Sequence, residues 1–278
     1  LLNRLIEQKI SITSRKSQTT RNNILGIKTK DNYQMVFIDT PGVHINASKA
    51  MNKVLNQSAL GAIEDADLII FMLQRNKINT LDELILKRLN GVKTKKICVI
   101  NKLDQVASIN TLLPIIEKLR SENDFAEIIP ISAKTGKNTN ELENMICQNL
   151  PENNHLYDSD TKFLAKESFM ISEIIREKII RFLGEELPHE TYVQLQKLED
   201  KENIINIDAE IIVARESQKG IVVGKNGAKL KKIGEKARID LEKFFNKKVF
   251  LKTWVKTKKN WNNDSDFISS LGIGSLYD

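Results

Sequence analysis

The segment KICVINKLD, residues 96–104, is the most informative part of this sequence, because an apolar strand runs directly into an N-K-x-D motif. Similar apolar runs, separated by amphipathic stretches, occupy Gln34–Asp39, Leu68–Leu73 and Glu127–Ser132. Runs this rich in Ile, Val, Leu and Phe are typical of parallel strands that helices cover on both faces. The pattern predicts an α/β doubly wound sheet, with the functional site in the loops at the carboxyl ends of its strands.

The N-K-x-D motif, Asn101-Lys102-Leu103-Asp104, suits the recognition of guanine. The carboxylate of Asp104 can accept hydrogen bonds from N1–H and from the exocyclic amine, a pair of donors that adenine lacks. A buried carboxylate left unpaired costs free energy, so adenine is rejected, while the aliphatic stem of Lys102 can lie across the base and ribose. A motif of four residues also arises by chance, so this one needs support from elsewhere in the chain.

Two further motifs end neighbouring strands. Asp39-Thr40-Pro41-Gly42 places Asp39 where a hydrated Mg²⁺ could be held, and glycine at position 42 lets its N–H approach a terminal phosphate closely. In Ser132-Ala133-Lys134, the N–H of Ala133 could reach the guanine carbonyl oxygen while Ser132 braces the loop. Each motif alone is also an ordinary turn. Together, three motifs at three successive strand ends predict a site that binds one nucleotide by its phosphates and its base.

These residues resemble the translation-factor-like GTPases, and KISITSRKSQTTR, residues 9–21, resembles the switch I region of the Era family. The likeness continues over nearly the whole chain. It implies GTP or GDP and Mg²⁺ as ligands, with a monovalent cation such as K⁺ as a further one. It also implies that Thr20, or as second choice Thr19, completes the Mg²⁺ shell with Asp39, and that Thr20 and Gly42 are the catalytic positions.

Hydrolysis by such a site is expected to be slow. The resemblance implies hydrolysis that does not rely on a glutamine after the D-x-x-G motif, and Val43 fits the apolar residue that replaces it, so a water held by backbone groups would attack the γ-phosphate. Acceleration by a partner fits this arrangement. His44, the next residue in the switch loop, is interpreted as structural and not as a catalytic base.

Family members carry a G-x-x-x-x-G-K-[ST] phosphate loop directly before the stretch that matches Leu1–Leu5, whereas the sequence given begins at Leu1. We therefore expect this chain to lack the first strand and the phosphate loop of a GTPase domain. On its own it is expected to bind GTP poorly or not at all, and we prefer the interpretation as a piece of a working GTPase over a natural truncation. Because that strand lies in the middle of the sheet in related GTPases, both of its neighbours are expected to carry open edges.

The segment PENNHLYDSD, residues 151–160, interrupts the pattern with polar and turn-forming residues. We expect an N-terminally incomplete GTPase domain over 1–150, a linker over 151–165, and a second domain with a C-terminal tail over 166–278. Periodicity in the second domain predicts helices and strands in the order of a compact α+β unit. The predicted segments are helices over Phe169–Leu183 and Ala228–Phe245, and strands over Thr191–Leu198, Ile204–Arg215 and Lys248–Val255.

The loop Gly224-Lys225-Asn226-Gly227 of this second domain resembles the G-x-x-G loop of type II KH domains. Its two glycines let the backbone approach a sugar-phosphate chain, and Lys225 and Lys229 add positive charge. An apolar groove supported by Ile221, Val222 and Val223 would receive unstacked bases. A bare G-x-x-G is common in turns. However, residues 209–260 hold fifteen Lys or Arg against five Asp or Glu, which favours a polyanionic partner.

Composition excludes several other classes of protein. The chain has 278 residues, of which 41% are hydrophobic and 28% charged, as is typical of a soluble globular protein of two domains. No apolar run approaches the ~20 residues that a membrane span needs. Cys98 and Cys147 lie in apolar segments without C-x-x-C spacing, so we expect core residues and neither a disulfide framework nor a zinc site. Trp254 and Trp261 are likewise interpreted as packing residues.

The resemblance implies an Era-like GTPase that binds small-subunit (16S) ribosomal RNA near its 3′ end and acts in assembly of the small ribosomal subunit. We expect a cytoplasmic monomer, and the resemblance allows peripheral contact with anionic membrane at the inner face of the cell membrane. Two alternatives stay open. One is a non-hydrolysing RNA-binding scaffold with a degenerate GTPase domain, and the other is a GTPase whose KH-like domain contacts proteins. We also hypothesise that the nucleotide state changes the affinity for RNA.

Overall fold

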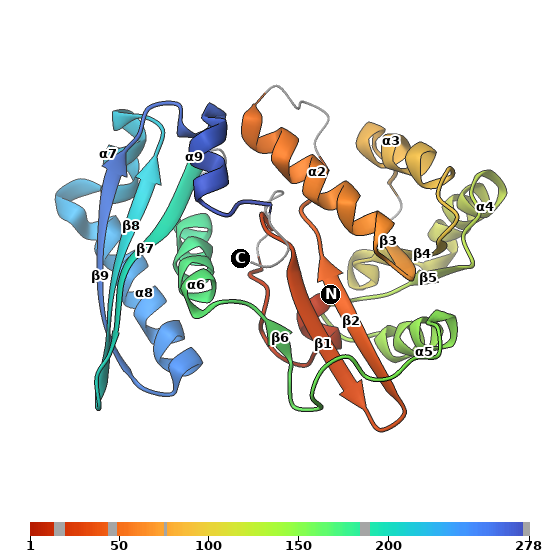
Figure 1. The fold of residues 1–278 in the computed structure, drawn as a ribbon. Coiled ribbons are helices and arrows are strands. Elements are labelled where there is room, and N and C mark those ends of the chain that lie inside the picture. The colour runs from red at the N-terminus through yellow and green to blue at the C-terminus, as the bar shows by residue number, and fades with distance from the viewer. Residues whose placement is uncertain (14–19, 44–48, 75–76, 184–189, 275–278) are drawn as a thin grey trace.

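The computed structural model describes residues 1–13, 20–43, 49–74, 77–183 and 190–274, which form two halves lying side by side (Figure 1). The elements of the first half are α1 (Leu2–Leu5), β1 (Ile24–Lys30), β2 (Tyr33–Asp39), α2 (Ala50–Glu64), β3 (Leu68–Gln74), α3 (Thr80–Leu89), β4 (Lys95–Asn101), α4 (Leu113–Glu122), β5 (Glu127–Pro130), α5 (Thr139–Asn149) and β6 (Phe163–Leu164). The second half contains α6 (Glu167–Phe182), β7 (Thr191–Asp200), β8 (Ile204–Val213), α7 (Glu216–Val223), α8 (Ala228–Phe245), β9 (Lys248–Thr257) and α9 (Ser265–Ser270).

The parallel sheet of the first half has the order β3-β4-β5. Its central strand β4 is buried over residues 96–100, and its apolar side chains alternate between two separate clusters. Residues of α3 and α4 complete one cluster, while α1 and α5 complete the other. Helices thus cover both faces, which confirms the α/β fold predicted from the apolar runs. Cys98 is fully buried on β4, as predicted, and burial raises the pKa of its thiol to about 12.

The other sheet of this half has the order β2-β1-β6 and is antiparallel. Asp39 pairs with Ile24 at one end of the hairpin and Tyr33 with Lys30 at the other. The prediction that the Gln34–Asp39 run belongs to a parallel sheet is therefore wrong: within the described residues, this strand pairs antiparallel with β1. Only two residues separate β1 from β2, and so short a connection can join strands only as a hairpin, since parallel neighbours need a longer crossover.

Both β2 and β3 lie at the end of their sheet, and no ladder joins them within the described part of the chain. Instead, Met35 and Phe37 of β2 share an apolar cluster with Leu68 and Ile70 of β3. Met72, further along β3, is 43% exposed. Within the described residues, the two sheets therefore meet through side chains.

The second half is a three-stranded sheet with the order β7-β8-β9, in which β8 pairs antiparallel with β7 and parallel with β9. Helices α6 and α8 pack on one face of this sheet (Figure 1). Helix α8 has the predicted bounds, and Arg215, predicted as the end of a strand, is the N-cap of α7. The element order helix, strand, strand, helix, helix, strand confirms the predicted α+β unit.

The segment predicted to be a linker is attached to the first half. Within it, β6 pairs with Leu25 and Gly26 of β1. The side-chain amide of Gln34 on β2 holds a second part of the segment, because its Oε1 accepts from the backbone N–H groups of Leu156 and Tyr157 at 2.7 and 2.9 Å. A two-residue strand has no periodicity to detect, so the sequence gives no signal for it. The domain limits at 150 and 166 stay a prediction.

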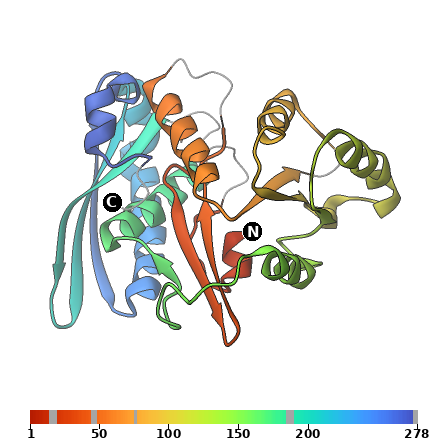
Figure 2. The ribbon, with the colours of Figure 1, turned by 45° about the vertical axis from the view of Figure 1, so that its right-hand side comes forward.

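The two halves share an apolar cluster between α2 and the C-terminal segment (Figure 2). Met51 and Leu55 of α2 pack there with Trp261 and Ile268. Trp261 is fully buried and its Nε1 donates to the carbonyl oxygen of Glu190 at 3.1 Å, which confirms its interpretation as a packing residue. None of the helices in the described ranges is long and apolar enough to cross a membrane.

Candidate nucleotide and RNA sites

The two guanine motifs, Asn101–Asp104 at the end of β4 and Ser132–Lys134 after β5, are joined by hydrogen bonds. The Oδ1 atom of Asn101 accepts from the backbone N–H of Lys102 at 2.7 Å and from that of Ala133 at 3.0 Å. Lys102 has a left-handed backbone, with φ 67° and ψ 37°, which a non-glycine residue adopts only at a cost. The N–H of Leu103 donates to the carbonyl oxygen of Ile131 at 2.9 Å. These bonds hold the two loops in one fixed arrangement.

Asp104 is oriented by a buried serine. The hydroxyl of Ser132, which is fully buried, donates to Oδ1 of Asp104 at 2.6 Å and accepts from the backbone N–H of Thr135 at 3.1 Å. Asp104 itself is exposed, so its carboxylate is fixed by Ser132 at a surface that a base could reach. The predicted bracing role of Ser132 agrees with this geometry. The N–H of Ala133, predicted to reach a guanine oxygen, donates here to Asn101 instead.

Arg4, on α1, supports this loop and was not predicted as a site residue from the sequence. Its guanidinium donates to the carbonyl oxygens of Ala133 and Lys134 at 3.3 and 2.7 Å. The side chain of Lys134 is exposed and that of Lys102 is partly buried. Arg4 therefore supports the backbone of the third motif from the amino-terminal helix, 129 and 130 residues away along the chain.

At the other end of the site, Asp39 is partly buried and its carboxylate accepts hydrogen bonds from two hydroxyl groups. The hydroxyl of Ser11 donates to Oδ2 at 2.9 Å and that of Thr20 donates to the same atom at 3.4 Å. Burial raises the pKa of Asp39, although these hydroxyls oppose the shift. Within the described residues no Lys or Arg side chain forms an ion pair with Asp39. The structure thus brings together Thr20 and Asp39, the two predicted metal ligands.

This donor set fits a hard cation. Asp39, Thr20 and Ser11 offer only oxygen atoms, which Mg²⁺ prefers, and a desolvated carboxylate is stabilised by a bound cation. No group of three or more His, Cys, Asp or Glu side chains that could hold a metal lies within the described ranges. A Mg²⁺ ion here would therefore complete its shell with phosphate oxygens and water, as is usual for this ion.

The remaining residues of the D-x-x-G motif follow Asp39 at the strand end. Thr40 is partly buried, Pro41 is buried and Gly42 is exposed. A Cβ placed on Gly42 would meet no atom within 4 Å, so the space beside its backbone is open. Val43 is partly buried. Thr19 and His44 lie outside the described residues, so the structure does not address the roles considered for them.

The candidate RNA loop joins α7 to α8. Gly224 has φ 71° and ψ 177°, and a Cβ there would lie 2.7 Å from the Cβ of Lys229, so only glycine fits. Gly227 has φ 76°, and Asn226 between them has φ 50°. Lys225 and Asn226 are exposed at the tip of this loop. The backbone thus protrudes from the helix pair with a positively charged side chain beside it.

The three apolar residues predicted to line the RNA groove differ in exposure. Ile221 is 44% exposed and can meet a base. Val222 is fully buried in the core of the second half, so the prediction that it binds RNA is wrong for direct contact, because helical periodicity turns it inward. Val223 is partly buried against the same core. Lys229 is also partly buried, packed against Gly224.

Both halves of the chain match known families of domains. A family model described as 50S ribosome-binding GTPase matches residues 1–102, and one described as KH domain matches residues 186–262. GTPase Era from Haemophilus influenzae (strain PittGG) is 45% identical over 273 residues, which cover 98% of this chain and 90% of that protein. The chain belongs to the Era family. GTPase Era from Coxiella burnetii (strain Dugway 5J108-111) is 44% identical, with 98% and 92% coverage.

Solved Era structures superpose on nearly the entire chain. A variant of Aquifex aeolicus Era bound to GDP·AlF₄⁻ matches with a TM-score of 0.94 and 33% identity, over 98% of this chain and 93% of that one. Era in complex with MgGDPNP and nucleotides 1506–1542 of 16S ribosomal RNA matches with the same TM-score and 34% identity, over 98% and 92%. The Era resemblance and the GTPase-plus-KH fold predicted from the sequence are therefore confirmed.

Proposed function

We propose that this Era-family chain binds GTP and GDP with Mg²⁺, hydrolyses GTP to GDP and phosphate, and binds 16S ribosomal RNA near its 3′ end in assembly of the small ribosomal subunit. One observation carries the proposal. An Era structure that contains both MgGDPNP and 16S ribosomal RNA aligns with 98% of this chain at a TM-score of 0.94. The motif residues at three strand ends and the G-x-x-G loop supply matching chemistry in each half.

For the nucleotide, Asp104 would accept hydrogen bonds from guanine, while Asn101 fixes the loop and Lys102 lies across the base. Thr20 and Asp39 would hold Mg²⁺, which when bound neutralises charge on the phosphates. The backbone of Thr40-Pro41-Gly42 would face the terminal phosphate, with Val43 offering no side-chain base. A monovalent cation such as K⁺ is a further proposed ligand. Slow turnover in the absence of a partner follows from this set of groups.

For the RNA, the G-x-x-G loop would clamp the sugar-phosphate backbone with Lys225 and Lys229 nearby, and Ile221 would meet an unstacked base. The basic stretch 209–260 adds a sequence-independent attraction to phosphates, so the affinity should fall steeply with salt concentration. We further propose a cytoplasmic protein with peripheral contact to anionic membrane. Sedimentation with vesicles of anionic and of neutral lipid tests that contact, and equal binding to both would refute an electrostatic one.

The full-length protein tests the function in two assays, GTP against ATP hydrolysis and binding to an RNA oligonucleotide of the 16S 3′ end. We expect hydrolysis of GTP only, and loss of RNA binding when Gly224 and Gly227 are changed to Asp. RNA binding without any hydrolysis would replace the proposal with a non-catalytic scaffold. Hydrolysis with RNA binding untouched by the glycine changes would instead indicate a KH domain used for protein contacts.

Coupling between the two halves is the remaining part of the proposal. If GTP and RNA favour the same arrangement of the domains, each must raise the affinity for the other by the same factor. The measurement is the RNA dissociation constant of the full-length protein with GDP and with a non-hydrolysable GTP analogue. Identical constants in the two states would show that the halves act independently.

A further inference from the structure

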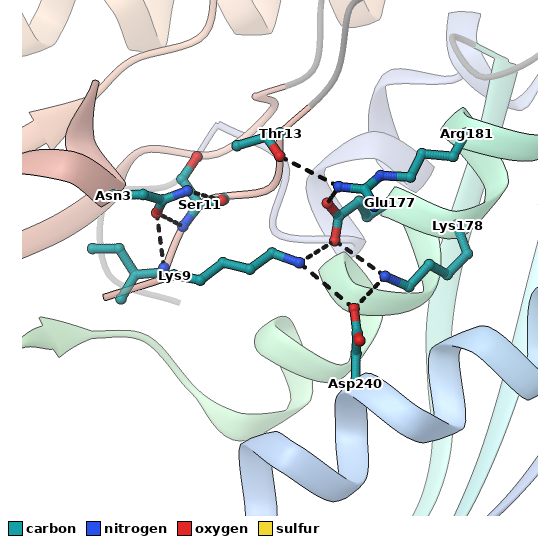
Figure 3. Close-up of polar contacts among 9 residues, drawn as sticks. Asn3, Lys9, Ser11, Thr13, Glu177, Lys178, Arg181 and Asp240 are labelled. Atoms are coloured by element: carbon teal, nitrogen blue, oxygen red, sulfur yellow. Dashed lines mark hydrogen bonds and ion pairs between the residues drawn. The ribbon is translucent and has the colours of Figure 1, made fainter. Parts of the chain in front are cut away.

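The switch I segment, residues 9–21, contacts the KH domain at both of its ends. At the first end, Nζ of Lys9 lies 2.6 Å from Oε2 of Glu177 on α6 and 3.6 Å from Oδ2 of Asp240 on α8 (Figure 3). Arg181, one turn after Glu177, donates to the hydroxyl of Thr13 at 3.4 Å. The amino-terminal arm of the segment is therefore fixed by two helices of the other domain.

The second end is anchored independently. The guanidinium of Arg21, which is buried, donates to the carbonyl oxygen of Thr191 at the start of β7, at 2.6 Å. The side-chain amide of Asn22 donates to the carbonyl oxygen of Gly272 at 2.9 Å. Both arms of the segment thus end on KH elements that are far apart in the sequence.

The same two arms supply the hydroxyls that reach Asp39. Ser11 is two residues after Lys9, and Thr20 directly precedes Arg21; both donate to Oδ2 of Asp39. The position of Ser11 is fixed further by Asn3, whose Oδ1 accepts from the backbone N–H groups of Ile10 and Ser11 at 2.8 Å each (Figure 3). A short route of ion pairs, backbone and one hydrogen bond therefore connects Glu177 and Asp240, through Lys9 and Ser11, to Asp39, the candidate Mg²⁺ ligand.

The KH side of this contact is built to hold a lysine in one place. Glu177 is fully buried, and Lys178 and Arg181 both bind its carboxylate in addition to Lys9. Lys178 also binds Asp240. The two carboxylates are thus oriented by residues of their own domain, while Lys9 is 49% exposed and comes from the other one. A buried, oriented acceptor such as Glu177 specifies position more strongly than a surface ion pair does.

We propose that Glu177 and Asp240 are positioning residues for GTP hydrolysis, acting through Lys9 to set the Ser11 hydroxyl on Asp39. This inference rests on the proposed function. Asp240 lies on α8, the helix that begins directly after the G-x-x-G loop, and twelve residues of α-helix span about 18 Å. One rigid helix thus connects the G-x-x-G loop to Asp240, which in turn contacts Lys9 of the switch I segment, so RNA at the loop and nucleotide at the site can influence each other through this route.

The kinetic test uses the full-length protein with Lys9→Met, Lys9→Arg and Asp240→Asn. We expect Lys9→Met and Asp240→Asn to lower kcat about tenfold, as a misplaced group does, while KM for GTP changes by less than about twofold. Lys9→Arg keeps the charge and should retain the parent kcat. If kcat of the parent changes when the 16S oligonucleotide is added, that change should be lost with Lys9→Met, whereas binding of the RNA alone should be retained.

Lys30→Met is the matched control. Lys30 is 54% exposed and its Nζ lies 2.7 Å from Oε1 of Glu143. The Lys30→Met variant therefore loses an ion pair comparable to that of Lys9, but one that lies within the GTPase domain. The kcat of Lys30→Met, and its response to the 16S oligonucleotide, should equal those of the parent. A parent-like kcat for Lys9→Met, or an equal loss for Lys30→Met, would overturn the proposal.

Amide hydrogen exchange gives a readout that needs no hydrolysis. The N–H groups of Ile10 and Ser11 are bonded to Asn3, so loss of the Lys9 contact should speed their exchange by about fivefold or more. Lys30→Met should leave these amides unchanged. If the parent failed to hydrolyse GTP, the proposed function would fall, but unchanged exchange in Lys9→Met is what would refute the positioning role itself.

Discussion

At the scale of single residues, the site depends on side chains that orient other side chains. Asp104 is held by Ser132, and Asp39 by Ser11 and Thr20. In each case a neutral hydroxyl fixes a carboxylate without neutralising it, so the negative charge remains for a ligand. Replacing the carboxylate should therefore change which ligand binds and should leave the loop largely intact.

Changing Asp104 to Asn tests this for the base. The amide keeps one oxygen acceptor but replaces the other by a donor, which opposes the N1–H and amine donors of guanine. In the full-length protein we expect GTP affinity to fall by about 100-fold or more, and xanthosine triphosphate, which carries a carbonyl in place of the amine, to become the better ligand. Competition binding with both nucleotides measures the shift. Retained preference for GTP would show that Asp104 does not contact the base.

The two glycines of the G-x-x-G loop offer a comparison at single positions. Gly224→Ala should destabilise the KH domain by about 1–3 kcal/mol, because its φ and ψ are accessible to glycine alone and the new Cβ meets Lys229. Gly227→Ala should cost about 1 kcal/mol, since only the positive φ opposes it and its surroundings are open. Urea unfolding followed by tryptophan fluorescence compares them. Equal costs would contradict the difference in packing.

At the scale of elements, the sequence predicted what periodicity reveals and missed what depends on long-range contact. The central strands and α8 were predictable because their apolar spacing is regular. Strand β1 was not, because Gly26 and the buried Lys28 break its pattern. A Cβ on Gly26 would lie 2.8 Å from Cδ1 of Ile10, so close packing explains this glycine. Ser11 and Arg4 escaped notice because their partners are remote in sequence.

Lys28 belongs to a buried polar cluster that joins β1 and β2 to α5. Its Nζ lies 2.8 Å from Oε2 of Glu143, and Lys30 and Tyr33 bind the other carboxylate oxygen. Burial alone would raise the pKa of Glu143, but the hydrogen bonds from these three side chains outweigh it and lower the pKa to about 2. The hairpin and α5 are therefore held together by an ionised carboxylate.

This lowered pKa predicts a pH dependence of stability. Because the folded-state pKa lies below the ordinary value of 4.5, the stabilisation is complete above about pH 4.5 and is lost as the pH falls toward 2. Glu143→Gln should thus cost up to about 3 kcal/mol at pH 7, and its difference from the parent should shrink between pH 5 and 3. Urea unfolding across this range measures it. A difference independent of pH would show that Glu143 acts through packing only.

At the scale of the whole molecule, the two domains are joined by apolar and polar contacts of different kinds. The cluster of α2 with Trp261 and Ile268 buries apolar surface, whereas the contacts of Lys9, Arg21 and Asn22 are polar and specific. Apolar contact stabilises association without fixing direction, and the polar contacts select one arrangement. This division of roles lets the domains remain associated if the polar contacts rearrange.

The apolar part can be tested because both tryptophans lie in the KH half, at positions 254 and 261. Leu55→Ala removes a buried side chain of α2 from the shared cluster, and should lower the midpoint of the tryptophan-detected thermal transition, since the KH half loses packing from its neighbour. Leu142→Ala is the matched control, being equally apolar and buried but inside the GTPase core. Leu142→Ala should lower the midpoint of the thermal transition detected by circular dichroism, which includes the first half, and should leave the midpoint of the tryptophan-detected transition unchanged. If both variants lowered the midpoint of the tryptophan-detected transition equally, the two halves would unfold as one cooperative unit. The shared cluster and the core of the GTPase domain would then act as one core.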